Sequence, residues 1–225
     1  MFKSTKSGHG KGDATRERVF AAALRLFRRR GFERTTMRDI AGQADLSLGA
    51  AYHYFPSKNA IALAYYEWMQ AEHERLVRSA CPADADLSAH LRALFHTKLD
   101  LLRHDRKLLA ALFGNLGDPS DPLSVFSRKT AGIRARSISL FVAAFEGAPL
   151  PRDLREMLGR AAWFAHLGVF LFSIHDSSPN QDRTRRLVDS LVDLVASGAL
   201  LLAHPMAAPI RQRLFRIMAE IAEAS

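Results

Sequence analysis

The sequence has little cysteine and no apolar run of membrane length. Its 225 residues include one cysteine, Cys81, which excludes an internal disulfide framework and a cysteine-rich zinc site. The longest uncharged run, Ala161 to Ile174, contains His166 and is shorter than the about 20 residues that a transmembrane helix needs. We therefore expect a buried helix over this run and no membrane partner.

The motifs of common enzyme classes are missing as well. The sequence has no HExxH pair, GxSxG elbow, P-loop or GxGxxG turn. His96 and Asp100, four residues apart, supply two metal ligands, which are too few for a catalytic zinc site. We expect no catalytic residue, no metal and no cofactor, and conclude that the chain is not an enzyme.

The N-terminal region carries most of the positive charge. The formal net charge is +9, and residues 1–60 hold 12 Lys and Arg against 5 Asp and Glu, whereas residues 61–225 hold 20 against 18. A basic head on a nearly neutral body is typical of proteins that bind a polyanion, although a basic face that serves only solubility would give the same totals. Residues 1–12 contain no apolar segment, so we expect no secretory leader and a cytoplasmic protein.

Hydrophobic periodicity predicts an all-α fold, because no stretch alternates polar and apolar residues as a half-buried strand would. In the N-terminal region we expect helices at about 13–30, 37–44, 48–54 and 58–80, with Gly31 ending the first and Pro82 following the last. Beyond Pro82 we expect longer helices at about 86–104, 106–116, 121–146, 151–175, 181–203 and 207–223.

Residues 35–58 form the most informative stretch. Two short helices separated by the turn Ala44-Asp45-Leu46 predict a helix-turn-helix, in which small residues such as Ala41 and Ala51 let the two helices approach closely. The second helix then presents its N-terminal end, which fits a DNA major groove about 12 Å wide.

The same stretch, with the helix before it, resembles the DNA-binding domain of TetR-family transcriptional regulators over residues 14–60. The matching residues are Ala22, Leu26, Phe27, Gly31, Phe32, Thr35, Thr36, Ile40, Ala41, Ser47, Gly49, Tyr52, Tyr54, Phe55, Ser57 and Lys58. Asp45 stands where the family commonly has glycine, and we expect the turn to survive because aspartate tolerates left-handed backbone geometry. The other three quarters of the chain carry no family motif of their own.

The resemblance implies which residues meet DNA. Thr36, Arg38 and Lys58 are predicted to bind phosphates, with Arg34 as a further candidate. Base readout is predicted for the start of the second short helix, where no side chain of residues 48–50 can form a hydrogen bond, so it depends on Ser47, Tyr52, His53, thymine methyls and DNA shape. Tyr52 and Phe55 could instead be core. The predicted DNA-binding residues are Thr36, Arg38, Ser47, Leu48, Gly49, Ala50, Tyr52, His53, Tyr54 and Lys58.

The resemblance also implies the domain organisation. We expect a flexible basic arm over residues 1–12, a DNA-binding domain over 13–60, and a helical ligand-binding and dimerisation domain over 61–225, joined by a long helix. A homodimer would form through helices at about 151–175 and 181–203, and would place two recognition helices on a palindromic operator in double-stranded DNA.

A small-molecule effector, largely apolar, is predicted to bind among aromatic and histidine side chains of the helical domain. The candidates are Trp68, His96, Phe113, Phe126, Phe145, Trp163, His166 and Phe170. Most of these side chains are expected to be ordinary core. We therefore predict a repressor released by its ligand, with two alternatives: a helix-turn-helix protein without an effector, and a nonspecific nucleic-acid packaging protein.

Overall fold

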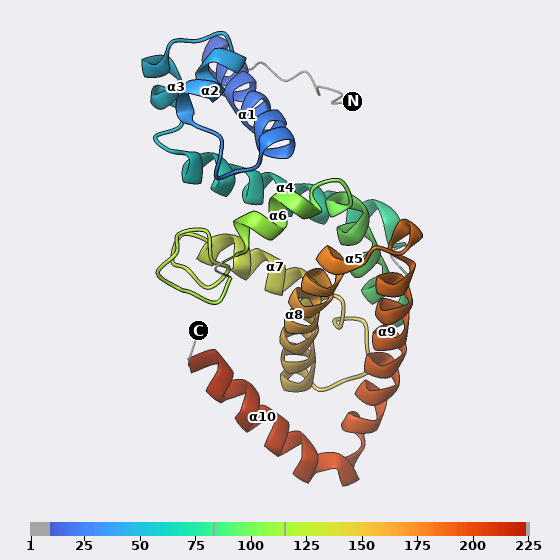
Figure 1. Ribbon diagram of the computed structural model, residues 1–225. Coiled ribbons are helices and arrows are strands. Elements are labelled where there is room, and N and C mark those ends of the chain that lie inside the picture. The colour runs from blue at the N-terminus through green and yellow to red at the C-terminus, as the bar shows by residue number, and fades with distance from the viewer. Residues whose placement is uncertain (1–9, 83, 115, 224–225) are drawn as a thin grey trace. The chain divides into compact units, whose positions relative to one another are not determined.

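The computed structural model describes residues 10–82, 84–114 and 116–223, and every regular element in these ranges is a helix (Figure 1). The chain divides into two compact units. The first comprises the residues up to Tyr66 together with Lys107–Lys129, and the second comprises Glu67–Arg106 together with the residues from Thr130 onward.

The first unit is built on three N-terminal helices. It contains α1 (Lys11–Arg30), α2 (Met37–Gln43), α3 (Leu48–Tyr54), the first turns of α4 (Lys58–Ala80) and nearly all of α6 (Arg106–Leu112). One face of α1 is buried at four-residue spacing, including Val19, Ala23 and Phe27, so α1 contributes the apolar stripe that the sequence predicts. Gly31 ends α1 with a φ of +88°, a conformation that glycine adopts without a Cβ clash.

The second unit is a bundle of longer helices. It contains the rest of α4, α5 (Leu87–Leu102), α7 (Ala131–Ala143), α8 (Arg152–His175), α9 (Asp182–Ala203) and α10 (Ala208–Glu223), with short 3-10 turns at Pro179–Gln181 and Pro205–Ala207. Helix α8 lies between α7 and α9, and α5 packs on α9. Helix α10 leaves α9 at a bend of 98° (Figure 1).

Helices α7 and α8 approach each other closely at Gly159. A Cβ built on Gly159 would lie 2.6 Å from the Cα of Val142, a distance that real Cβ atoms do not reach. Glycine is therefore required at this position by the packing of the two helices.

The segment before α7 corrects one expectation. The sequence predicts a helix from residue 121, but α7 begins at Ala131, so that prediction is wrong over its first ten residues. Short polar side chains bind the backbone there instead: Asp121 accepts from the Leu123 amide, and the Ser127 hydroxyl donates to the Pro122 carbonyl. Such local bonds compete with the helical pattern.

The connection between α8 and α9 is fixed by a buried carboxylate. Asp176 accepts hydrogen bonds from the backbone amides and hydroxyls of Ser178 and Thr184. Burial alone would raise the pKa of the Asp176 carboxyl, but these four bonds outweigh it and hold the pKa well below its usual range. The Arg106 guanidinium, which belongs to the same unit, donates to the Ser173 and Asp176 carbonyls.

Helix α8 is long and apolar enough to cross a membrane, with a mean hydropathy of 1.4 over 18 residues, and the bent pair 179–203 and 205–220 passes the same test. Helix α8 packs between α7 and α9, and 44% of that window is buried inside the chain. We therefore interpret α8 as a core helix, as the sequence predicts.

Gly159→Ala should destabilise the protein. The added methyl group meets backbone, so α7 and α8 must separate, at a cost of about 1–3 kcal/mol. For a chain of this length we expect the melting temperature to fall by about 2–4 °C per kcal/mol, measured by circular dichroism. The matched control is Gly132→Ala, where nothing lies within 4 Å of an added Cβ. An unchanged melting temperature for Gly159→Ala would contradict the close approach.

Candidate functional site

The start of α2 is held by a reciprocal cap. The Thr36 hydroxyl accepts from the Asp39 amide at 3.1 Å, and the Asp39 carboxylate accepts from the Thr36 amide at 2.9 Å. The Thr36 hydroxyl also donates to that carboxylate, and these bonds lower the pKa of the Asp39 carboxyl. Thr36 and Arg38 are both exposed at this helix end, and a capping box of this kind fixes where the chain enters the helix.

The turn between α2 and α3 has the left-handed geometry expected of it. Asp45 has a φ of +52°, a region in which aspartate is more common than most residues. The Arg18 guanidinium on α1 donates to the Ala44 carbonyl at 2.6 Å and to the Asp45 carbonyl at 3.4 Å. Arg18 therefore anchors the turn to α1.

Buried alanines bring α2 and α3 together. Ile40, Ala41 and Ala44 are buried at the end of α2, and Ala51 is fully buried on α3. Phe55 follows α3 and is buried as well, with its ring 6.5 Å from that of Phe20. These contacts leave the opposite side of α3 facing outward.

The outward side of α3 carries the predicted base-reading residues. Ser47 caps the helix by accepting from the Ala50 amide at 3.1 Å, and Gly49 is exposed beside the half-buried Leu48 and Ala50. Tyr52 is 47% exposed, so it is not a core residue, and His53 is exposed next to it. Tyr54 is half-buried with its ring 5.2 Å from the His53 ring.

Lys58 at the start of α4 is engaged inside the unit. Its ammonium group donates to the Phe32 carbonyl at 2.9 Å and to the Glu33 carbonyl at 3.3 Å. The same group lies 4.6 Å from the centre of the Phe32 ring. These contacts hold the end of α1 against α4 and suit a residue that positions the helix-turn-helix. Its predicted phosphate contact stays a prediction.

The predicted effector residues fall in both units. Phe113 and Phe126 belong to the first unit, where Phe113 stacks on Tyr66 at 5.3 Å. The other six belong to the second unit: Trp68, His96, Phe145, Trp163, His166 and Phe170. Trp163 donates to the Ser137 hydroxyl at 3.1 Å, and His96 lies 3.0 Å from the Asp189 carboxylate between α5 and α9.

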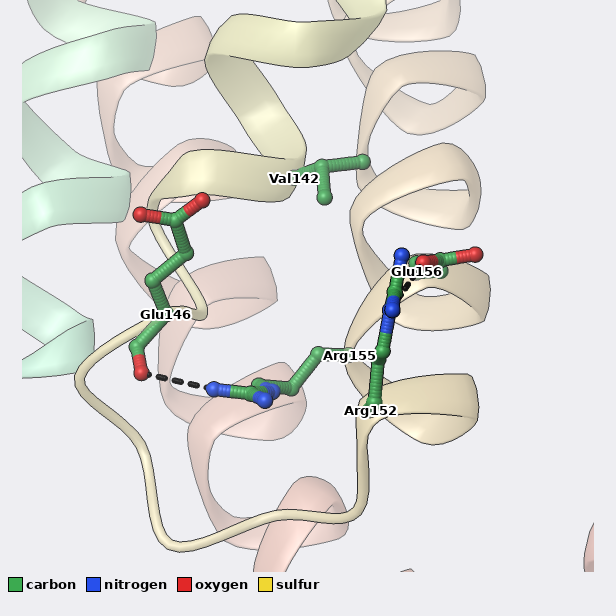
Figure 2. Close-up of a pocket in the computed structure, with 5 residues that line it drawn as sticks. All are labelled: Val142, Glu146, Arg152, Arg155 and Glu156. Carbon is green, nitrogen blue, oxygen red and sulfur yellow. Dashed lines mark hydrogen bonds and ion pairs between the residues drawn. The ribbon is translucent and has the colours of Figure 1, made fainter.

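A pocket of about 450 Å³ lies at the connection between α7 and α8 (Figure 2). It is lined by Val142, Glu146, Arg152, Arg155 and Glu156. Arg155 donates to the backbone carbonyl of Glu146 at 2.8 Å, and Arg152 pairs with the Glu156 carboxylate at 3.1 Å. None of the predicted effector residues lines this pocket.

Three residues with structural roles are not predictable from the sequence motifs. Arg18 anchors the α2–α3 turn, but the apolar periodicity of α1 does not indicate that contact. His73 and Lys98 interrupt the buried stripes of α4 and α5, and a charged or imidazole group at a stripe position is the pattern that would have revealed them. Lys3 and Lys6 of the predicted arm lie outside the described residues, and α1 already begins at Lys11.

Two capped helices that meet through alanines and present one outward helix define a helix-turn-helix protein. A family model described as bacterial regulatory proteins, tetR family, matches residues 19–65. A second model, described as tetracyclin repressor-like, C-terminal domain, matches residues 90–207, which is more than half of the chain. The chain belongs to the TetR family of DNA-binding transcriptional regulators, which are not enzymes.

Relatives are found among curated proteins. A probable HTH-type transcriptional regulator, ArpR of Pseudomonas putida, is 32% identical over 116 residues, covering 52% of this chain and about half of its own length (48%). An uncharacterized HTH-type regulator of Mycobacterium tuberculosis is 28% identical over 194 residues, covering 84% of this chain and 91% of its own.

Solved structures agree with the fold. Thermus thermophilus FadR, a TetR-family repressor in complex with lauroyl-CoA, is 28% identical with a TM-score of 0.59, covering 84% of this chain and 97% of its own. A TetR-family regulator from Syntrophomonas wolfei is 15% identical with a TM-score of 0.64, covering 83% and 97%, and shows likeness of fold alone.

Lys58→Met should lower the stability of the protein, because the Phe32 and Glu33 carbonyls lose their donor while the stem is kept. We expect a cost of about 1 kcal/mol, or about 2–4 °C in melting temperature. Lys107→Met, at an exposed lysine of the same unit, should leave it unchanged. A variant of native stability with weaker DNA binding would instead identify Lys58 as a phosphate contact.

Proposed function

We propose that this regulator is a repressor that binds a palindromic operator as a homodimer and is released by a small, largely apolar ligand. The observation that carries the DNA-binding part is the capped α3, held by buried alanines with its opposite side exposed. DNA binding implies a cytoplasmic protein. The functional domains are proposed as residues 13–60 and 61–225, preceded by a basic arm.

Operator recognition combines few base contacts with many phosphate contacts. Gly49 and Ala50 bring the backbone of α3 close to the base edges, and Leu48 meets thymine methyl groups. Tyr52 and His53 supply exposed hydrogen-bonding groups one turn further along. Thr36 and Arg38 reach phosphates from the start of α2. With so few polar groups at the base edges, DNA shape contributes part of the specificity.

Dimerisation through α8 and α9 is supported by the large apolar side chains that these helices expose. Leu171 and Phe172 on α8 are exposed, and so are Leu194, Leu200 and Leu201 on α9, the last at 71%. Helices α8 and α9 contact each other, and large exposed apolar residues on adjacent helices support an association surface. A second copy of the chain is the partner expected of it, because a palindromic operator requires a two-fold symmetric reader.

Effector binding is proposed for the second unit, among Trp68, Phe145, Trp163, His166 and Phe170. The lauroyl-CoA complex of the FadR relative supports a ligand with a long apolar part. Helix α4 contributes residues to both units, so a ligand that favours one position of α4 would change the separation of the two DNA-binding units in the dimer.

Two alternative functions predict different experimental results. A regulator without an effector would keep its operator affinity with every small molecule tested. A packaging protein would bind unrelated duplexes equally, with a steep salt dependence and no specific component.

Operator binding is tested on sheared genomic DNA of the source organism, passed over immobilised protein at physiological salt. We expect a few fragments that share an inverted repeat to be enriched. Tyr52→Ala and Arg38→Ala should abolish or weaken that enrichment by about tenfold or more. Arg213→Ala, an exposed arginine on α10, is the control and should enrich the same fragments. Binding without sequence preference would overturn the proposal in favour of packaging.

The dimer face is tested by placing a charge on it. Leu194→Glu should convert the dimer to a monomer in analytical ultracentrifugation and reduce affinity for the enriched fragments, because a buried carboxylate at the seam has no partner. Ala135→Glu puts the same charge at an exposed position of α7 and should remain dimeric. A dimeric Leu194→Glu protein would show that the subunits associate elsewhere.

A further inference from the structure

Three helices of the second unit each place a nitrogen-bearing side chain in a stripe that is otherwise apolar. On α5 the buried positions Leu91, Leu94 and Leu102 share a face with Lys98. On α8 the stripe that contains Trp163 and Val169 also contains His166. On α4 His73 is fully buried one turn before the buried Val77. A soluble domain rarely buries such groups without a role for them.

The two histidines have unmet hydrogen-bonding capacity. His73 Nε2 lies 2.9 Å from the Leu94 carbonyl, but its Nδ1 has no partner, and neither ring nitrogen of His166 has one among the described residues. The His166 ring sits between aromatic rings, 5.2 Å from Phe141 and 6.1 Å from Phe95. Buried polar atoms without partners are rare in native proteins and call for an explanation.

Lys98 adds a positive charge to the same group. No carboxylate of the described residues lies within 4 Å of its ammonium group. Burial lowers the pKa of Lys98 to about 8, and the more distant Glu74 opposes that shift. Glu74 itself is bound to Arg136 at 3.0 Å and to Gln70 at 3.1 Å, so its charge is already paired. Part of the Lys98 side chain remains accessible, unlike His73.

The electrostatics of the three groups are coupled. Burial is the main cause that lowers the pKa of His73 to about 3, and it lowers that of His166 well below its usual value; the charge of Lys98 adds to both shifts. At neutral pH the group therefore holds one cation and two neutral imidazoles. The Lys98 ammonium group and the single N–H of neutral His166 can both donate to an anion with oxygen atoms, whereas the Lys98 charge repels a metal cation and stays unpaired beside a neutral ligand.

We propose that Lys98 and His166 form the polar end of the effector site and bind the carboxylate of an otherwise apolar ligand, with Phe95 and Phe141 contacting its apolar part. The inference rests on the proposed effector-responsive function and names the chemical class of the effector. The ammonium group supplies the charge-assisted bond, and the neutral His166 ring donates one hydrogen bond that fixes the orientation of the acid. His73 already donates its N–H to the Leu94 carbonyl and therefore does not bind the carboxylate.

The test compares acids with their own neutral derivatives. Straight-chain fatty acids of graded length and phenylalkanoic acids are titrated against the full-length protein by calorimetry, each beside its methyl ester and its alcohol. We expect at least one acid to bind, and its ester and alcohol to bind about tenfold or more weakly. Trp163 lies one helical turn from His166, so its fluorescence reports binding in the same region.

Variants assign the binding to Lys98 and His166. Lys98→Met should weaken the affinity for the acid by about tenfold or more and leave the affinity for its ester unchanged. Lys129→Met, at an exposed lysine, should change neither affinity. Lys98→Met removes an unpaired charge from desolvated surroundings, so it should fold with an unchanged or higher melting temperature. His166→Asn keeps hydrogen-bonding groups and should therefore reduce the affinity for the acid less than His166→Phe does.

Three results would overturn the inference: esters that bind as tightly as acids, an acid affinity that Lys98→Met leaves unchanged, or no acid binding below about 1 mM. Its failure is separable from that of the proposed function. Enriched operator fragments with no acid binding would overturn the proposed acid site and leave the proposed operator binding intact. Acid binding that depends on Lys98, with no enriched fragment, would overturn the proposed operator binding and support the acid site.

Discussion

The helix-turn-helix of this protein, which we propose as its DNA-reading element, depends on the close contact of α2 and α3 through Ala41, Ala44 and Ala51. Any larger side chain at these buried positions would push the two helices apart and change the orientation of the exposed side of α3. The Thr36–Asp39 cap, the Ser47 cap and the Arg18 bonds to the turn then fix where each helix begins and how the turn runs. The reading helix is thus positioned before any DNA is present, which reduces the ordering cost of binding.

The second unit is packed by different means. Its helices are longer, and the contact between α7 and α8 requires glycine at position 159, whereas α5 is joined to α9 by ion pairs such as Arg185 with Asp100. Within this apolar bundle, Lys98, His73 and His166 retain unused hydrogen-bonding capacity. A domain that only held two DNA-binding units together would be more stable with apolar residues at those positions. The same groups are useful to a domain that must respond to a ligand.

The sequence allowed the all-α fold, the helix-turn-helix and the family to be predicted, because helical periodicity, capping residues and the Tyr52 to Lys58 motif are local features. The left-handed Asp45 and the exposed Tyr52 also agree with the analysis. Contacts between residues distant in the chain were not predictable: Arg18 with the turn, Lys58 with the Phe32 carbonyl and Gly159 with Val142 depend on tertiary packing. The apolar spacing of residues 121–130 predicts a helix because it does not reveal the side-chain bonds that replace the helix there.

The central claim is that α3 is the element that reads DNA. Hydrogen exchange of the full-length protein, followed by mass spectrometry with and without an enriched genomic fragment, measures this directly. The account predicts that bound DNA slows amide exchange at the start of α2 and across residues 47–54, and leaves α10 unchanged. Protection that is absent from residues 47–54 and present in the helices of the second unit would contradict it.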